Sequence, residues 1–157
     1  MKRYLFLLSM LIVATAALGT DLRAQLKPMA PAIPVSQMNN IEELVNRYFV
    51  SLNEPDDKKR RDMVKQVWSE KGKFGVVRIV EADGLDAIDE LTKGDMLKFP
   101  NTTVRRTSHI DGSGNYYRWN FVRSREDGKV IASGVDYAII VDGKLLSVIG
   151  FLDSFES

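Results

Sequence analysis

The sequence of 157 residues contains no cysteine and only one histidine, His109. Without cysteine the fold cannot be held by disulfides, so its stability must come from packing, and a lipid anchor attached through cysteine is excluded. One histidine leaves little material for a multi-histidine metal site or a Ser-His-Asp triad. The chain also lacks a glycine-rich phosphate loop, a nucleotide fingerprint and a nucleophile elbow. We therefore expect no metal and no cofactor, and any chemistry would be acid–base work.

An excess of charge of one sign is also lacking, with 22 Lys and Arg residues against 21 Asp and Glu residues. Removal of an N-terminal segment that contains Lys2, Arg3, Arg23 and Asp21 leaves 19 basic and 20 acidic residues. A chain this close to neutral has no excess charge to attract nucleic acid or an anionic membrane surface. We therefore expect neither of them as a partner.

The longest apolar run, from Leu5 to Leu18, follows two basic residues and precedes small residues that end at Ala24. This order is typical of a secretory signal peptide. The run of about 14 residues is shorter than the roughly 20 that a spanning helix needs, which makes a membrane anchor the weaker interpretation. We predict a signal peptide over residues 1–24, cleaved after Ala24 or Gly19, and a periplasmic or secreted mature protein.

Residues 25–38 contain three prolines between apolar residues and show no helical or strand periodicity. We predict that they form an extended leader to a single domain over residues 39–157, which is long enough for one core. The charged cluster Asp56–Asp62 is interpreted as a solvated helix face. Apolar residues at helical spacing predict three helices, over about 40–53, about 56–70 and about 85–99.

A β-branched and apolar run from Phe74 to Val80 predicts one strand, and four long strands joined by glycine-containing turns follow Thr102. Three helices followed by an antiparallel meander predict an α+β fold. We expect a cone-shaped, curved antiparallel sheet packed on the three N-terminal helices, with an internal cavity.

Two Asp-Gly turns predict the register of the last three strands. A two-residue loop at Asp127-Gly128 favours a type I′ hairpin that places Asp136 opposite Trp119. The same reasoning at the second turn, residues 142–143, places Ile149 beside Asp136. One face of these strands would then be an aromatic wall around a single carboxylate, and we interpret it as the lining of a pocket. Its predicted members are Tyr117, Trp119, Phe121, Asp136, Ile149 and Phe151, with Trp68 and Phe99 as further core or wall residues.

The opposite face of the same strands is also largely apolar. A sheet that is apolar on both faces is covered on both faces. Three helices can cover only the concave side, so we expect a homodimer in which a second copy covers the convex side. The residues predicted for this outer face are Val135, Tyr137, Ile139, Val148 and Leu152.

The chain resembles SnoaL-like proteins of the nuclear transport factor 2-like superfamily over roughly residues 40–154. The resemblance rests on the order and spacing of several short stretches: Y-F-V-S-L-N from Tyr48, W-S-E-K-G-K-F from Trp68, G-L-D-A-I from Gly84, F-P from Phe99, Y-R-W from Tyr117, G-V-D from Gly134 and D-G-K-L-L-S-V-I-G-F-L-D from Asp142. It implies a cone-shaped barrel that is usually dimeric, with a deep apolar cavity. Members of the superfamily include isomerases, cyclases, dehydratases, epoxide hydrolases and proteins with no known reaction.

Asp136 matches the strand position at which SnoaL-like cyclases carry a carboxylate that takes a proton from carbon. Apolar walls raise a carboxyl pKa toward the range of a general base. Alternatively, Asp136 accepts a hydrogen bond and only fixes the shape of the cavity. Tyr48 on the first helix is a candidate hydrogen-bonding partner, although core packing also explains it. His109 is a second candidate, and its side of the sheet depends on the length of the loop near residue 113.

Three functions remain open from the sequence. The first is an exported domain that binds a small apolar or amphipathic molecule, with no assigned reaction. The second is a cofactor-free lyase, isomerase or cyclase that uses Asp136 as general base. The third is a structural or interaction module whose cavity is filled by its own side chains.

Overall fold

The computed structural model describes residues 35–156, so the predicted signal peptide and residues 25–34 of the predicted leader lie outside the described residues. Three helices are present in this part of the chain: α2 (Val35–Leu52), α3 (Asp57–Val67) and α4 (Leu85–Lys98). They are accompanied by seven strands: β1 (Trp68–Val76), β2 (Val80–Asp83), β3 (Thr102–Arg106), β4 (Asp111–Ser113), β5 (Tyr116–Arg125), β6 (Val130–Val141) and β7 (Lys144–Phe155).

Two helix boundaries differ from the predictions. Helix α2 begins at Val35, inside the predicted leader, because Met38 extends the three-residue spacing of apolar positions that continues at Ile41. Helix α3 ends at Val67, because Trp68 adopts extended backbone angles and starts β1 directly. Among the described residues, no helix is both long and apolar enough to cross a membrane.

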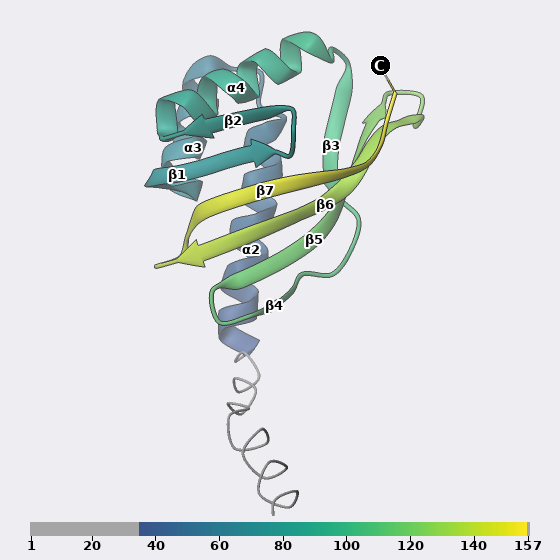
Figure 1. The fold of residues 1–157 in the computed structure, drawn as a ribbon. Coiled ribbons are helices and arrows are strands. Elements are labelled where there is room, and N and C mark those ends of the chain that lie inside the picture. The colour runs from purple at the N-terminus through teal and green to yellow at the C-terminus, as the bar shows by residue number, and fades with distance from the viewer. Residues whose placement is uncertain (1–34, 157) are drawn as a thin grey trace, which may run out of the picture. The chain divides into compact units, whose positions relative to one another are not determined.

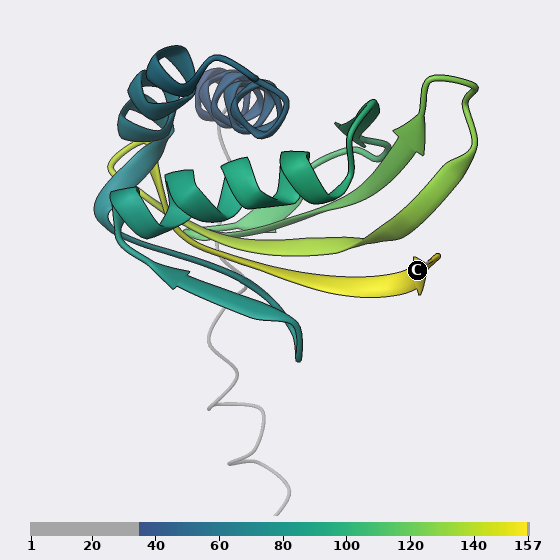
Figure 2. The same ribbon diagram turned by 90° about the horizontal axis from the view of Figure 1, so that it is seen from above.

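The strands form one curved sheet in the order β2-β1-β7-β6-β5-β3, with β4 paired to the first residues of β5 (Figure 1). The predicted antiparallel sheet is therefore mixed, since β1 pairs with β7 in parallel and all other neighbours are antiparallel. The helices lie on one side of the sheet, whose far ends curl around them (Figure 2). The α+β fold is confirmed, and the curl encloses space between the sheet and α4.

The register between β5 and β6 is confirmed, with Trp119 opposite Asp136 and Phe121 opposite Gly134. The connecting loop differs from the predicted one: it has three residues, 126–128, with Gly128 at positive φ. The N–H of Arg125 donates to the carbonyl of Lys129, and the N–H of Gly128 donates to the carbonyl of Arg125. A bulge at the start of β6 compensates for the extra loop residue, because two residues of β6 there oppose one of β5.

The predicted register between β6 and β7 is wrong by one residue beyond the turn. Ile140 pairs with Leu145 as predicted, but Ile139 pairs with Ser147, so Leu146 is an extra residue. Because side chains alternate between faces, this extra residue sends the side chains of residues 147–152 to the other face, up to a second register shift at Asp153. Gly150 therefore stands opposite Asp136 in place of Ile149.

This shift exchanges the inner and outer residues of β7. Ile149 and Phe151, predicted to line the pocket, lie on the outer face and are nearly half exposed. Val148 and Leu152, predicted to lie outside, face inward instead, where Val148 is fully buried and Leu152 lines the pocket. The outer face thereby gains two large apolar side chains and the pocket loses them.

The core lies between α2, α3 and the concave side of the sheet. Its centre is a group of aromatic rings in which Tyr48 contacts Trp68 at 6.0 Å and Trp119 at 5.9 Å between ring centroids. These three side chains are fully buried. Packed rings of this kind are rigid, and they fix the positions of the polar atoms that Tyr48 and Trp119 carry.

Candidate functional site

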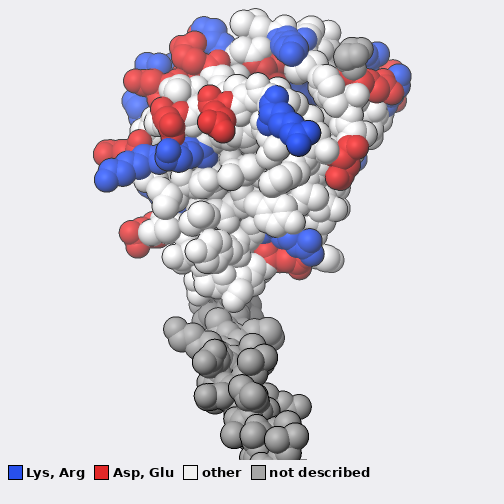
Figure 3. Space-filling model, in the orientation of Figure 1, with Lys and Arg blue, Asp and Glu red and all other residues white. Residues whose placement is uncertain are grey.

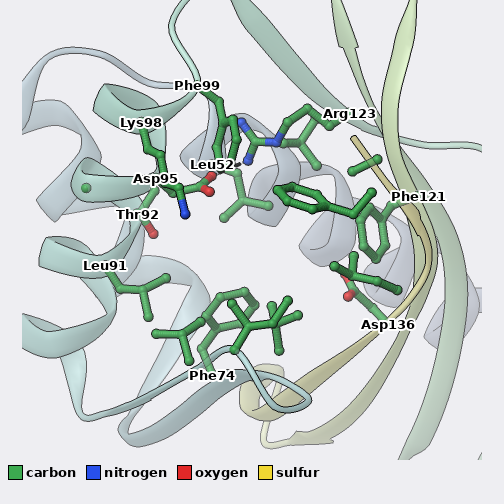
Figure 4. A pocket seen from close by; sticks show the side chains of 18 of the residues that line it. Leu52, Phe74, Leu91, Thr92, Asp95, Lys98, Phe99, Phe121, Arg123 and Asp136 are labelled. Carbon is green, nitrogen blue, oxygen red and sulfur yellow. Dashed lines mark hydrogen bonds and ion pairs between the residues drawn. The ribbon is translucent and has the colours of Figure 1, made fainter. Parts of the chain in front are cut away.

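A pocket with a volume of about 410 Å³ opens between α4, α2 and the curled part of the sheet. Most of its wall is apolar, and Figure 4 shows the side chains that face the space. Sites for small molecules are typically concave and apolar, with a few polar groups that orient the ligand. The polar side chains of this wall are Tyr48, Thr92, Asp95, Lys98, Arg123 and Asp136.

Asp136 lies in the wall of this pocket on β6, and the residue is only 4 % exposed. Its Oδ2 atom accepts two hydrogen bonds, from Trp119 Nε1 at 3.1 Å and from Tyr48 Oη at 3.2 Å. No donor among residues 35–156 contacts Oδ1. Because no fully buried side-chain oxygen of the described chain lacks a partner, Oδ1 retains access to the pocket. The carboxylate is thus held by one oxygen and free at the other.

Burial raises the pKa of Asp136 to about 7, although the hydrogen bonds from Trp119 and Tyr48 act in the opposite direction. The burial effect is larger because both donors are uncharged and no cation compensates the carboxylate. Burial and the neighbouring Asp136 also raise the pKa of Tyr48 well above its ordinary value. Tyr48 therefore remains a hydrogen-bond donor, while Asp136 exchanges a proton near neutral pH.

The glycine opposite Asp136 on β7 makes room for the free oxygen. A Cβ atom at Gly150 would lie 3.1 Å from Oδ1 of Asp136, a tighter contact than most Cβ atoms make. The bulge at Leu146 brings this glycine to the position for which the sequence predicted isoleucine. A larger residue here would press on the carboxylate, so the bulge contributes directly to the geometry of the site.

The second polar group of the pocket lies on the far side of the space from Asp136 (Figure 4). Arg123 on β5 forms an ion pair with Asp95 on α4, and its Nη1 atom donates to Thr102 Oγ1 at 2.9 Å. The guanidinium lies 4.9 Å from the ring centre of Phe99, and Lys98 Nζ lies 5.3 Å from the same centre. Within residues 35–156, no group of three or more acidic, histidine or cysteine side chains is placed to hold a metal ion.

The structure places the predicted site residues in three environments: the pocket wall, the core, and positions away from both. Tyr48, Phe99, Phe121 and Asp136 line the pocket. Trp68, Trp119 and Tyr117 are buried in the core, and of these only Trp119 contacts Asp136 with a polar atom.

His109 does not line the pocket, and neither do Ile149 and Phe151. The loop before β5, on whose length the side of His109 was predicted to depend, is a two-residue turn at Gly114-Asn115. His109 lies outside β4 and is exposed, so it does not reach Asp136.

Sequence reasoning missed Asp95, Lys98 and Arg123. Leu91, Asp95 and Lys98 follow one another at four- and three-residue spacing, which places them on one face of α4. Arg123 continues the inward alternation of Trp119 and Phe121 along β5. The helical spacing and the strand alternation are both visible in the sequence. Charged residues at such positions, however, are usually exposed to solvent, so neither pattern indicated a pocket.

No family model and no curated protein sequence matches the chain. Several solved structures, by contrast, have a similar fold. A proposed isomerase of the SnoaL-like family from Agrobacterium tumefaciens superposes with a TM-score of 0.69 at 26% identity, over 74% of this chain and 99% of that one. A proposed SnoaL-like polyketide cyclase from Jannaschia sp. gives 0.61 at 14% identity, over 73% and 86%. A proposed ketosteroid isomerase from Kribbella flavida gives 0.57 at 14% identity, over 76% and 82%. The chain therefore has the SnoaL-like fold of the nuclear transport factor 2-like superfamily.

Proposed function

We propose that this domain binds a small, largely apolar molecule in its pocket and that Asp136 takes a proton from that molecule. The observation that carries the proposal is a carboxylate with one free oxygen in an apolar wall, whose pKa burial raises to about 7. A group with this pKa is present in both protonation states near neutral pH, which suits a general base. The similar solved structures include proposed isomerases and a proposed cyclase, and proton transfer at carbon is consistent with both activities.

The reaction that fits this arrangement is removal of a proton from a carbon next to a carbonyl or a similar electron-withdrawing group. Oδ1 of Asp136 accepts the proton, and the electron pair moves onto the electron-withdrawing group of the ligand. Tyr48 and Trp119 hold Oδ2 and so act as positioning residues. Because their bonds also stabilise the carboxylate, they keep the pKa of Asp136 from rising further.

Binding without a reaction is the second candidate, and the size of the pocket favours it over a purely structural module. A volume of about 410 Å³ is within the range of small-molecule sites. A module whose cavity is filled by its own side chains would leave no such space beside Asp136. The free oxygen of Asp136 supports the catalytic proposal, because a general base needs a carboxylate oxygen that the ligand can reach.

A general probe of carboxylate bases in apolar pockets tests the catalytic proposal. In 5-nitrobenzisoxazole a base removes the proton on carbon, the N–O bond breaks, and a coloured cyanonitrophenolate forms. We expect saturable turnover that rises with pH around a midpoint of about 7. Asp136→Asn should abolish it, because the amide cannot accept the proton.

The matched control is Asp142→Asn in the turn between β6 and β7. Asp142 is exposed and lies at φ 52, a conformation that asparagine also tolerates. This variant should retain the turnover of the unmodified protein. Equal turnover in Asp136→Asn and the unmodified protein would exclude Asp136 as the base, and displaceable binding without turnover would leave binding alone as the function.

We also propose that a second copy of the chain covers the outer face of the sheet. Figure 3 shows this face, where uncharged residues fill the centre and charges lie mostly toward the margins. Tyr137, Ile149 and Phe151 are each more than 40 % exposed there, and the rings of Tyr137 and Phe151 contact edge to face. Sedimentation analysis should report a dimer that Phe151→Glu converts to monomer; a monomer in the unmodified protein would contradict this proposal.

Export to the periplasm or out of the cell remains a proposal from the N-terminal sequence alone. Its basis is the order of basic, apolar and small residues over residues 1–24, which lie outside the described part of the chain. Mass spectrometry of protein recovered from the periplasm or medium should find a mature N-terminus after Ala24 or Gly19. Full-length protein retained in the cytoplasm would contradict it.

A further inference from the structure

The pocket has polar groups at two separated places and apolar walls between them. Asp136 lies on one side beneath Phe121, and the second group, formed by Asp95, Lys98 and Arg123, lies on the other (Figure 4). Proton removal by Asp136 gives no role to this second group. Its charged side chains therefore have another role: either they stabilise the fold by pairing with one another, or they bind a different part of the ligand.

Arg123 is already engaged within the protein. Its side chain is 11 % exposed, it forms an ion pair with Asp95, and it donates to Thr102. The face of its guanidinium rests on Phe99. The positive charge of Arg123 is therefore balanced by Asp95, and its geometry is fixed from three directions.

Lys98 is engaged much less. Its ammonium lies 5.3 Å from the centre of the Phe99 ring, and no carboxylate among residues 35–156 comes within ion-pair distance of it. Lys98 is exposed and lines the pocket. Two cations against one carboxylate leave this side with one uncompensated positive charge, while the nearest other acidic group in the wall, Asp136, is on the opposite side.

We infer that the ligand is an amphipathic monoanion whose charged group binds Lys98 while its apolar body fills the pocket toward Asp136. The inference rests on the proposed binding function and names the class of ligand. One negative charge on the ligand balances the one uncompensated cation on this side of the pocket. The apolar lining between the two polar places takes a hydrocarbon or aromatic body. A carboxylate or sulfonate has the required charge.

Two fluorescent probes that differ only in an anionic group test this assignment. The anion is 8-anilinonaphthalene-1-sulfonate, and its neutral counterpart is N-phenyl-1-naphthylamine. In Lys98→Gln we expect the sulfonate to bind about fivefold more weakly, the size of a partly exposed charge interaction. Binding of the neutral amine should stay within about twofold, because it carries no group for Lys98. Added salt should weaken only the sulfonate.

Two control variants locate the effect. Lys71→Gln removes an equal charge from an exposed site that does not line the pocket, and it should leave both probes unchanged. Leu91→Trp fills the pocket from α4 and should weaken both probes. If Leu91→Trp leaves sulfonate binding intact, the probe binds elsewhere and the assignment of Lys98 is overturned.

The outcomes separate this inference from the proposed function on which it rests. Equal losses of both probes in Lys98→Gln, or no loss of the sulfonate, would overturn the anion site while the apolar pocket stands. Failure of both probes to bind the unmodified protein would overturn the pocket as a binding site, and the anion site with it. A selective loss of the sulfonate in Lys98→Gln supports both.

Discussion

Asp89 and Asp136 are equally buried carboxylates in very different surroundings. Asp89 is 3 % exposed and Asp136 is 4 % exposed. Asp89 accepts bonds from two cations, Arg60 Nε at 2.8 Å and Arg61 Nε at 3.2 Å, and both of its oxygens are used. Asp136 accepts bonds from uncharged donors only, and one oxygen is free. The two carboxylates therefore differ in their counter-ions and not in their burial: Asp89 is paired with two arginines, whereas Asp136 has no cationic partner.

The largest effect is expected at the structural carboxylate. Asp89→Asn leaves the guanidinium of Arg60, which is 1 % exposed, with only the exposed Asp57 as a charged partner. Breaking a buried ion pair by removing one partner typically costs about 3–5 kcal/mol. We expect the free energy of unfolding, measured in urea, to fall by about 4 kcal/mol, the middle of this range.

Asp86→Asn is the control on the same helix. Asp86 pairs with Arg61 at 3.6 Å, and both side chains are largely exposed. Exposed pairs of this type contribute little, so its effect should stay below about 0.5 kcal/mol. Equal losses in the two variants would show that the Arg60–Asp89 pair does not hold α3 to α4 as described.

The next largest effect is the pH dependence that Asp136 gives to stability. Between about pH 4 and about pH 7 the folded state keeps a proton on Asp136 that the unfolded state releases. The raised pKa therefore stabilises the fold at low pH, and this stability is lost as the pH rises through about 7. From about pH 5 to about pH 8.5 the loss amounts to about 3 kcal/mol.

Asp136→Asn removes this dependence, since the amide does not titrate. Urea unfolding of both proteins at the two pH values isolates the contribution of Asp136, because all other groups are shared. The variant should gain stability relative to the unmodified protein as the pH rises. A difference between the two proteins that does not change with pH would contradict the raised pKa.

A smaller effect is expected when one donor to Asp136 is removed. Tyr48→Phe deletes the hydroxyl that donates to Oδ2, a bond that stabilises the charged form. We expect the pKa of Asp136 to rise by about one unit, the size of a hydrogen bond to a charged group. Carboxyl-carbon NMR titration measures it. Tyr117→Phe, whose hydroxyl donates to the carbonyl of Gly114, should leave the pKa of Asp136 unchanged.

The sequence was informative where local chemistry determines structure. The Asp-Gly turn and the alternation of strands sufficed to place Trp119 opposite Asp136, even though the turn has a different length. It was uninformative at Leu146, because a bulge leaves no distinct residue pattern, and Ile149 and Phe151 were consequently placed on the wrong face. Arg60 was also placed wrongly, on a solvated helix face. A charged residue within a charged cluster does not indicate that it forms an ion pair with a buried carboxylate on another helix.

The second polar group of the pocket, formed by Asp95, Lys98 and Arg123, was missed for a related reason. Asp95 and Arg123 come from elements far apart in the sequence, and only the curl of the sheet brings β5 to α4. Contacts between polar residues of different elements leave no periodic pattern in the sequence, whereas the apolar faces of helices and strands do. The helical face of α4 and the alternation along β5 could therefore have predicted that these residues face inward. They could not have predicted that the two side chains form an ion pair.

The pKa of Asp136 in the unmodified domain is the measurement that tests the account most directly. Carboxyl-carbon NMR titration gives it, with Asp136→Asn to assign the signal. The structure predicts a value of about 7, because burial without a cation outweighs two neutral hydrogen bonds. A value at or below the ordinary aspartate figure of about 3.9 would show a carboxylate already satisfied by its partners, and would contradict its role as a general base.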